Sequence, residues 1–126
     1  MPVVDLSDHP TIDTEYGRWQ PLNGPLGVGG FGISAIVCDP GEAFDIEHDE
    51  SESGQQEVYV VVAGRAAFQI GDESVEAGPG EVASAPDPMA KRAYRALEPG
   101  TRIVCLGAQP SGAGDYGDWI TDAASG

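Results

Sequence analysis

The sequence predicts an all-β domain, a small barrel or sandwich of short strands. Its 126 residues include 18 glycines and 10 prolines, which favour short elements joined by tight turns over long helices. Strand-like runs recur at spacings of about 8–12 residues, as in sandwiches and barrels. No segment shows a sustained helical period. A chain of this length is long enough to bury one core, so we expect one domain.

The first part of the chain, residues 1–26, is expected to form an irregular arm. Asp, Pro, Gly and Asn interrupt any period there, and Trp19 is expected to anchor the arm on the domain. The barrel is expected over residues 27–107. Its first strand, which contains a glycine and follows two more, is expected over residues 31–38.

The stretch 40–64 organises the predicted barrel. Pro40 and Gly41 form a turn, after which apolar residues alternate with acidic ones up to His48. This period of two places His48 on the inward face. A polar loop over 49–56 follows, and β-branched residues make 57–64 the clearest strand of the chain.

The remaining strands are separated by clear turn signals. They are expected over residues 66–70, 74–77, 81–86, 91–97 and 101–106, with a hairpin turn at 71–73. Residues 108–126 form a polar tail of Gly, Ala, Ser and Asp. The tail is expected either to dock through Tyr116 and Trp119 or to carry one helical turn.

Charge and composition exclude several classes of partner. The formal net charge is −15, and such a surface repels phosphate backbones and anionic membranes, so we expect no nucleic-acid or membrane partner. No apolar stretch approaches the roughly 20 residues that span a bilayer. Residues 1–19 lack the pattern of a secretory signal, so we expect a cytoplasmic protein. Cys38 and Cys105 lie in apolar runs and are expected to be buried free thiols.

Two half-motifs in the predicted barrel resemble those of the cupins. Gly41 follows Pro40, and Glu57 is separated by six residues from Gly64, as in the first cupin motif. Gly80 is separated by five residues from Pro86, as in the second motif. The resemblance covers residues 31–106 and implies a double-stranded β-helix, the cupin or jelly-roll barrel.

The first motif departs from the family pattern at its histidines. Counted from Gly41, the two histidine positions fall on Glu47 and Asp49, with His48 between them. Shifting the register by one residue makes His48 the second histidine and Ile46 the first. The strand period favours the shifted register.

The second motif departs further, since Pro88 replaces its glycine, Lys91 its metal-binding histidine and Arg95 its asparagine. The resemblance implies a site of three histidines and one glutamate for iron, manganese, zinc or nickel. The chain has two histidines, and His9 lies outside the barrel, so three histidine ligands are impossible.

Two hypotheses for the centre of the site follow. In one, His48 and Glu57, helped by Asp49 or Glu52, bind a divalent metal ion weakly. In the other, an inward ion pair of Glu57 and Lys91 takes the place of the metal. The alternative for Lys91 is a solvated side chain on an exposed loop. The alternative for the acidic residues within 47–52 is a solvated loop.

Other residues are candidates for lining the barrel. Tyr59 shares strand parity with Glu57, so both should face the same way, and Gln69 and Tyr94 are further candidate ligand-binding residues. The alternative for Tyr59 is a core tyrosine whose hydroxyl is satisfied.

Three functions remain open from the sequence. The first is a barrel that binds a small molecule without a strong metal site, as a sensor, carrier or accessory protein. The second is an enzyme: a metal-dependent oxygenase or isomerase using His48 and Glu57, or a metal-free isomerase or cyclase using Glu57, Lys91 and Tyr59 as acid and base. The third is a dimeric building block, and we expect a homodimer. Fold alone does not choose among them.

Overall fold

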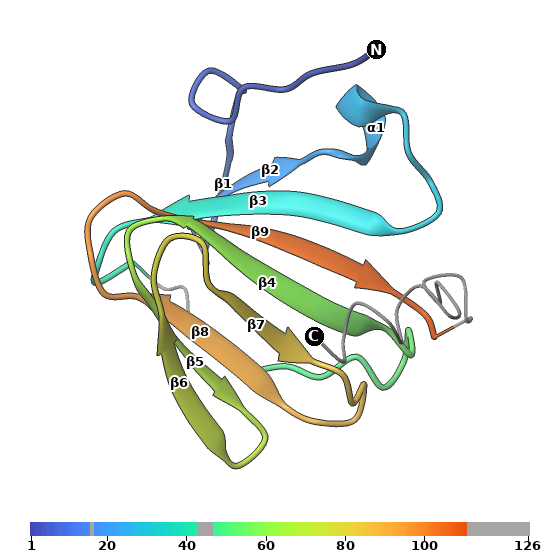
Figure 1. Ribbon diagram of the computed structural model, residues 1–126, viewed down its shortest axis with the longest axis vertical. Helices are drawn as coiled ribbons and strands as arrows, with labels where there is room; N and C mark the ends of the chain where they lie inside the picture. Colours follow the sequence, from blue (N-terminus) through green and yellow to red (C-terminus); the bar gives the residue numbers. More distant parts are fainter. Residues whose placement is uncertain (16, 43–46, 111–126) are drawn as a thin grey trace, which may run out of the picture.

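The computed structural model describes residues 1–15, 17–42 and 47–110, and it confirms the all-β prediction (Figure 1). The described part contains one helix of four residues, α1 (Asn23–Leu26). The strands are β1 (Ile12–Thr14), β2 (Gly17–Pro21), β3 (Gly32–Cys38), β4 (Gln56–Ala63), β5 (Ala66–Ile70), β6 (Glu73–Ala77), β7 (Val82–Ala85), β8 (Arg92–Ala96) and β9 (Thr101–Ala108). No helix in these residues is long and apolar enough to cross a membrane.

The strands form two antiparallel sheets. The large sheet has the order β1-β2-β3-β9-β4-β7, and the small sheet has the order β6-β5-β8. Because β4 leaves the large sheet through Gly64 and continues as β5 of the small one, the chain itself links the two layers (Figure 1).

The barrel strands begin and end within two residues of their predicted limits, from β3 through to β9. The predicted strand before His48 falls partly on residues 43–46, which lie outside the described residues. His48 itself forms an isolated antiparallel bridge with Arg92. The prediction for the tail also lies outside the described residues from residue 111 onward.

The prediction of an irregular N-terminal arm holds for residues 1–11, which lie in no helix or strand, and is wrong for residues 12–26, which contain β1, β2 and α1. β1 pairs with β2, and β2 pairs with β3 in a register that places Trp19 opposite Ile36. β2 is five residues long and ends at a proline, so its alternation is too short to stand out in the sequence. Gln20 is fully buried, and its Nε2 donates hydrogen bonds of 2.9 Å to the carbonyls of Leu6 and His9.

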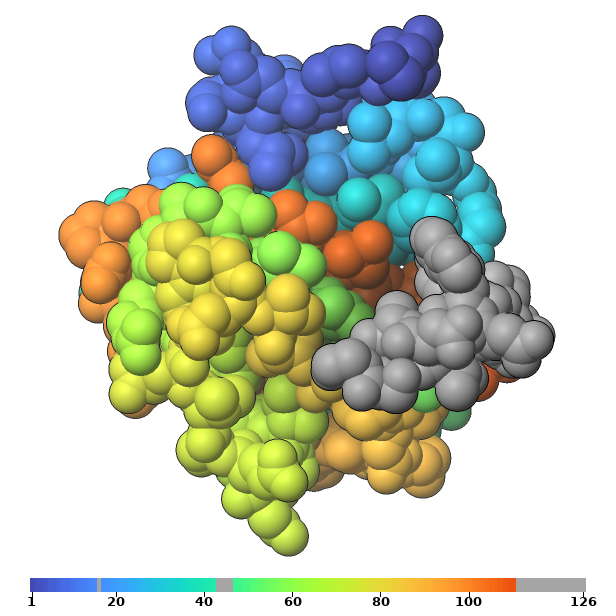
Figure 2. Space-filling view, viewed as in Figure 1, coloured from blue at the N-terminus to red at the C-terminus, as the bar shows by residue number. Residues whose placement is uncertain are grey.

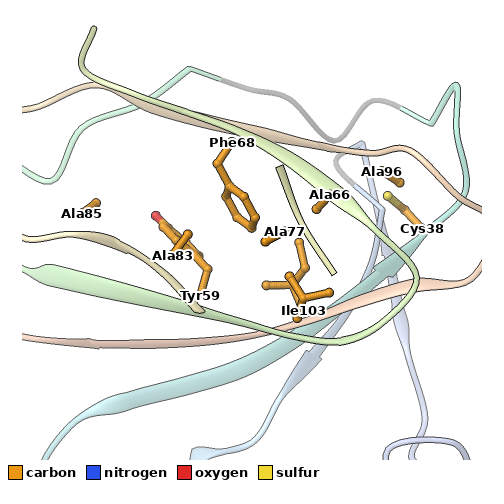
Figure 3. Packing of buried hydrophobic residues seen from close by; sticks show 10 residues of the cluster. Cys38, Tyr59, Ala66, Phe68, Ala77, Ala83, Ala85, Ala96 and Ile103 are labelled. Atoms are coloured by element: carbon orange, nitrogen blue, oxygen red, sulfur yellow. The ribbon is translucent and has the colours of Figure 1, made fainter. Parts of the chain in front are cut away.

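The core lies between the sheets, and aromatic rings fill its centre. Tyr59 of the large sheet packs on Phe68 of the small sheet with ring centroids 5.5 Å apart, and Tyr94 lies 5.3 Å from Tyr59 and 5.9 Å from Phe68. Ile103 and several alanines close the packing around these rings (Figure 3). Since Tyr59 points its hydroxyl toward the Ala85 side, the polar end of this ring marks one end of the core (Figure 3).

Buried thiol and phenol groups in the core are expected to make the fold less stable at alkaline pH. Burial raises the pKa of Cys38 from 9.0 to about 12 and also raises the pKa of Tyr59 and of Tyr94. In the folded chain these groups hold their protons at pH values where the unfolded chain has lost them. Their stabilising effect is therefore complete below pH 9 and falls as the pH rises through the range 9 to 12 for Cys38, and above pH 10 for the tyrosines.

We expect the melting temperature to fall steadily above about pH 9 in scans from neutral to alkaline pH. Cys38→Ala is expected to flatten part of the first fall, because it removes one of the two thiols, Cys38 and Cys105, whose pKa the fold raises above its ordinary value of 9.0. A melting temperature that is constant from pH 9 upward, or a Cys38→Ala curve parallel to the wild type, would contradict this account.

Candidate functional site

The candidate site is a cluster of four polar side chains at one end of the core, called here the polar cluster. It consists of Glu57 on β4, Arg92 at the start of β8, and His48 and Glu50 from the segment between β3 and β4. The side chains are 11% exposed for Glu57, 0% for Arg92, 34% for His48 and 22% for Glu50. The cluster is thus buried on one side and open on the other.

Glu57 is the centre of the polar cluster. The alternation along β4 turns Glu57, Tyr59 and Val61 inward, which confirms the parity predicted for Tyr59. The Glu57 Oε1 atom accepts hydrogen bonds from Arg92 Nη1 (2.9 Å) and from the Tyr59 hydroxyl (3.0 Å). Its Oε2 atom accepts a hydrogen bond from Cys105 Sγ (3.4 Å). Both carboxylate oxygens are therefore engaged by donors of the chain itself.

Two of the donors to Glu57, Tyr59 and Cys105, keep their protons at neutral pH. Burial, followed by the nearby Glu57 charge, raises the pKa of both Tyr59 and Cys105. Tyr59 and Cys105 thus act as neutral donors. Cys38 and Cys105 are both free thiols, as predicted, but only Cys38 is buried, and Cys105 is partly exposed.

Arg92 is a fully buried guanidinium whose three nitrogens all have acceptors. Nη1 donates to Glu57, Nη2 to the carbonyls of Asp87 (2.7 Å) and Ala90 (3.0 Å), and Nε to Ala90 (3.2 Å). The side chain therefore ties the turn 87–90 to β4. Since it is inaccessible, Arg92 positions Glu57 and does not itself reach a ligand.

His48 is held by its backbone, and its side chain is partly exposed. Its N–H donates to the Arg92 carbonyl (2.9 Å), and the Arg92 N–H donates to the His48 carbonyl (2.8 Å). Its Nε2 atom lies 3.5 Å from Glu50 Oε1 and 3.7 Å from Glu57 Oε1, which is longer than a hydrogen bond. The Nδ1 atom is buried without a hydrogen-bond partner. His48 therefore faces the two carboxylates, whereas the strand period predicted only that it lies on the inward face.

Glu50 is the acidic partner of His48, in place of the predicted Asp49 or Glu52. Its Oε2 accepts a hydrogen bond from Ser53 Oγ (2.6 Å), and its backbone N–H donates to the Pro88 carbonyl (2.9 Å). Asp49 and Glu52 are exposed. Hydrogen bonds from Ser51 lower the pKa of Asp49 and fix its carboxylate within the loop. The sequence carries no signal that separates Glu50 from its acidic neighbours.

The predicted ion pair between Glu57 and Lys91 is wrong by one residue. Lys91 Nζ lies 3.7 Å from Glu47 Oε1, and the two side chains are 68% and 63% exposed. Arg92 takes the inward position because it has the same strand parity as Tyr94, whose ring lies in the core. The period of two along 91–97, applied from Tyr94, could have identified Arg92 from sequence.

The predicted ligand-binding residues divide between the two faces of the small sheet. Tyr94 lies inside with Tyr59. Gln69 does not, because its neighbour Phe68 takes the inward position on β5. The Gln69 side chain is exposed on the outer face, where Nε2 donates to the Gly71 carbonyl and Oε1 accepts from Ser74 Oγ. Gln69 is therefore not part of the polar cluster.

The residues of the polar cluster do not fit a metal site of three histidines and one glutamate. One imidazole is present, and His9 lies on the N-terminal segment, where its carbonyl accepts from Gln20. The oxygens of Glu57 are hydrogen-bonded, and the buried Arg92 charge repels a cation at the same carboxylate. His48, Glu50 and Glu57 do offer one ligand atom each within 4.8 Å of one another.

Comparisons with known proteins identify the fold. No family model matches the chain, and no curated protein matches it. A solved structure from Thermus thermophilus aligns with a TM-score of 0.68 at 20% identity, covering 87% of this chain and all of that one. KdgF from a Halomonas species aligns with a TM-score of 0.67 at 18% identity, covering 83% of this chain and 92% of its own.

A third structure carries the family name. It is a sugar phosphate isomerase of the cupin superfamily from Silicibacter pomeroyi, which aligns with a TM-score of 0.65 at 15% identity over 86% of this chain and 76% of that one. At these identities the likeness concerns the fold. The two antiparallel sheets, the strand order and these neighbours agree with the half-motifs in the sequence. The chain therefore has the fold of a small cupin β-barrel.

Proposed function

We propose that the chain is a small-molecule-binding cupin barrel whose polar cluster recognises its ligand without a tightly bound transition metal. The observation that carries this proposal is the fully buried Arg92 guanidinium, 2.9 Å from Glu57 Oε1. An internal cation holds the carboxylate that would otherwise be available to a metal. The pair lies on the buried side of the cluster, which leaves Glu50 and His48 to meet a ligand.

The charges of the polar cluster favour a neutral or cationic ligand that donates hydrogen bonds. Glu50 and Glu57 contribute two negative charges and Arg92 one positive charge, and Arg92 is inaccessible. Carboxylate oxygens accept hydrogen bonds from hydroxyl and amine groups and repel phosphates. The rings of Tyr59, Phe68 and Tyr94 fill the centre of the barrel, so the ligand would bind at the end of the core.

The ligand class is tested by thermal-shift titration with neutral sugars and polyols, primary amines, and sugar phosphates. We expect at least one polyol or amine to raise the melting temperature, and we expect both His48→Ala and Glu50→Gln to abolish the shift. Gln69→Ala, on the outer face, is the matched control and should retain it. A preference for sugar phosphates, no shift with any class, or a shift that survives both variants would count against the proposal.

A second candidate is a divalent-metal site with a reduced ligand set, which the grouping of His48, Glu50 and Glu57 within 4.8 Å favours. Metal content after dialysis separates it from the first. About one transition metal per chain, lost in His48→Ala, would support the metal site and overturn the proposal above. The metal-free acid and base pair of Glu57 and Lys91 has no support, because Lys91 is paired with Glu47 in solvent.

A further inference from the structure

Gln55 differs from every other glutamine of the chain in the bonding of its side chain. The other four each donate their Nε2 atom to a backbone carbonyl: Gln20, Gln56, Gln69 and Gln109. Gln55 lies directly before β4 and is partly buried, yet its amide forms no hydrogen bond with the described residues. An amide carries two donor hydrogens and an acceptor oxygen, so this side chain is available to a ligand.

Two distances place the Gln55 amide beside Glu57. Gly107 of β9 is paired with Glu57, so a Cβ built on Gly107 would point to the same face of the sheet as the Glu57 side chain. That Cβ would lie 3.0 Å from Gln55 Oε1 and 3.5 Å from Glu57 Cγ. Alternation along the chain agrees, because Gln55 has the parity of Glu57 and of the buried Tyr59. Gln55 therefore borders the polar cluster on the inward face.

The glycine at position 107 fits the close approach of this amide. Gly107 lies within β9 and is not among the glycines with positive φ, so no turn conformation requires it. A glycine inside a strand often marks a place where another group comes close to the backbone. Here the contact of 3.0 Å between Gln55 Oε1 and a Cβ would be closer than the best carbon contacts, at about 3.5–4.0 Å. The absence of a side chain at Gly107 leaves room for the Gln55 amide.

Ser53 holds Gln55 and Glu50 in one hydrogen-bonded loop. Its hydroxyl donates to Glu50 Oε2 (2.6 Å) and accepts from the Gln55 backbone N–H (3.3 Å). Its carbonyl accepts from Gln109 Nε2 (2.7 Å), which joins the loop to the residues that follow β9. The backbone of Gln55 is thus held in place next to the polar cluster, while its amide is left unpaired.

The N-terminal segment does not supply a partner for this amide. Figure 2 shows that segment, in dark blue, at the top of the molecule, beyond β2 and β3 (Figure 1). In the order of the large sheet, β3 and β9 separate β2 from β4. The Gln55 amide, at the start of β4, is therefore far from the segment that binds the Gln20 amide.

An amide beside carboxylates selects hydroxyl groups over ammonium groups. The carboxylates of Glu50 and Glu57 only accept hydrogen bonds, whereas the Gln55 Nε2 atom only donates them. A hydroxyl group both donates and accepts, but an ammonium group only donates. Because the amide and the Glu57 side chain lie side by side, two neighbouring hydroxyls of one ligand fit them.

We infer that Gln55 makes the polar cluster specific for a vicinal diol, a pair of hydroxyls on adjacent carbons as in neutral sugars. One hydroxyl donates to a carboxylate of the cluster, and its neighbour accepts from the Gln55 amide. This inference rests on the proposed function and narrows its ligand class from polyols and amines to polyols.

The experiment compares three compounds that share one six-membered ring, by their effect on the melting temperature of the full chain. myo-Inositol has hydroxyls on adjacent carbons, cyclohexane-1,4-diol has them on opposite carbons, and cyclohexylamine has an ammonium group. A compound that binds the folded chain raises its melting temperature with concentration. We expect the largest shift with myo-inositol, because it alone offers adjacent hydroxyls to the carboxylates and the amide.

Variants at two adjacent glutamines locate the effect. Gln55→Met keeps the length of the side chain, and it should weaken myo-inositol binding about fivefold through the loss of one hydrogen bond. Gln55→Glu replaces the donor by a third carboxylate and should reverse the preference, so that cyclohexylamine gives the larger shift. Gln56→Glu adds the same charge at an exposed residue of opposite strand parity and should keep the wild-type preference.

Circular dichroism melts confirm that each variant is folded. The inference is overturned, and the proposed function is not, if cyclohexylamine or cyclohexane-1,4-diol shifts the wild type as much as myo-inositol does. The same holds if Gln55→Met binds myo-inositol as the wild type does while His48→Ala loses the shift. A wild-type chain that responds to no polyol and no amine would overturn both.

Discussion

Arg92→Met is expected to lower the free energy of unfolding by about 3–5 kcal/mol, the typical cost of removing one partner from a buried ion pair. The variant keeps the length of the side chain and removes its charge. Glu57 then remains largely buried with a negative charge and no cation, and the carbonyls of Asp87 and Ala90 lose their donors. Both losses act in the same direction. Urea titration followed by far-ultraviolet circular dichroism measures the change.

The control for this prediction is the adjacent residue. Lys91→Met removes the same unit of charge from an exposed side chain whose partner, Glu47, is also exposed, and it should leave the urea midpoint unchanged within error. The double variant Glu57→Gln with Arg92→Met should be more stable than Arg92→Met alone, since it removes the stranded charge. Equal effects at positions 91 and 92 would refute the assignment of Arg92 to the polar cluster.

Gly64→Ala is expected to cost at least about 3 kcal/mol or to prevent folding, through a clash combined with backbone strain. Gly64 lies at the turn between β4 and β5 with φ 70°. A Cβ built there would lie 2.7 Å from the backbone Cα of Thr101, which cannot move aside as a flexible side chain would. Thr101 is fully buried and fixed, since the Arg65 N–H donates to its Oγ1 and that hydroxyl donates to the Glu98 carbonyl.

Gly71→Ala separates the clash from the strain. Gly71 has a similar φ of 58°, but no heavy atom lies within 4 Å of a Cβ built on it. We expect Gly71→Ala to cost only the conformational part, about 1–2 kcal/mol. Thermal melts of the two variants side by side measure the difference. A Gly64→Ala chain as stable as Gly71→Ala would show that Thr101 does not exclude a side chain at position 64.

The strands of the barrel could be predicted because each carries its own local signal. β4 is a run of β-branched residues ended by glycine, and β5 to β9 are separated by turns that contain glycine or proline. β2 could not be identified in this way, because its stability comes from pairing with β3 and from the burial of Gln20 by a segment eleven to fourteen residues away. Such contacts leave no periodic trace in a five-residue strand.

The polar cluster was predictable only in part, for a related reason. Parity along β4 placed Glu57 and Tyr59 together, and the structure joins them by a hydrogen bond. The residue spacing of the second cupin motif indicated Lys91 as the partner of Glu57. The alternation along β8 instead turns Arg92 inward, and Arg92 is the observed partner. A contact that depends on strand register changes partner when the register shifts by one residue. The position of Glu50 depends on its loop, which a backbone hydrogen bond from Glu50 N–H joins to the Pro88 carbonyl. No spacing of residues in the sequence specifies such a contact.

The ring packing of Tyr59, Phe68 and Tyr94 has a consequence for how this protein can evolve. These rings stabilise the barrel from its centre, whereas His48 and Glu50 lie outside the core cluster and are partly exposed. Substitutions at His48 and Glu50 can therefore accumulate without loosening the packing between the sheets. Under the proposed function, selection is free to change the ligand at the polar cluster while the scaffold that presents it stays the same.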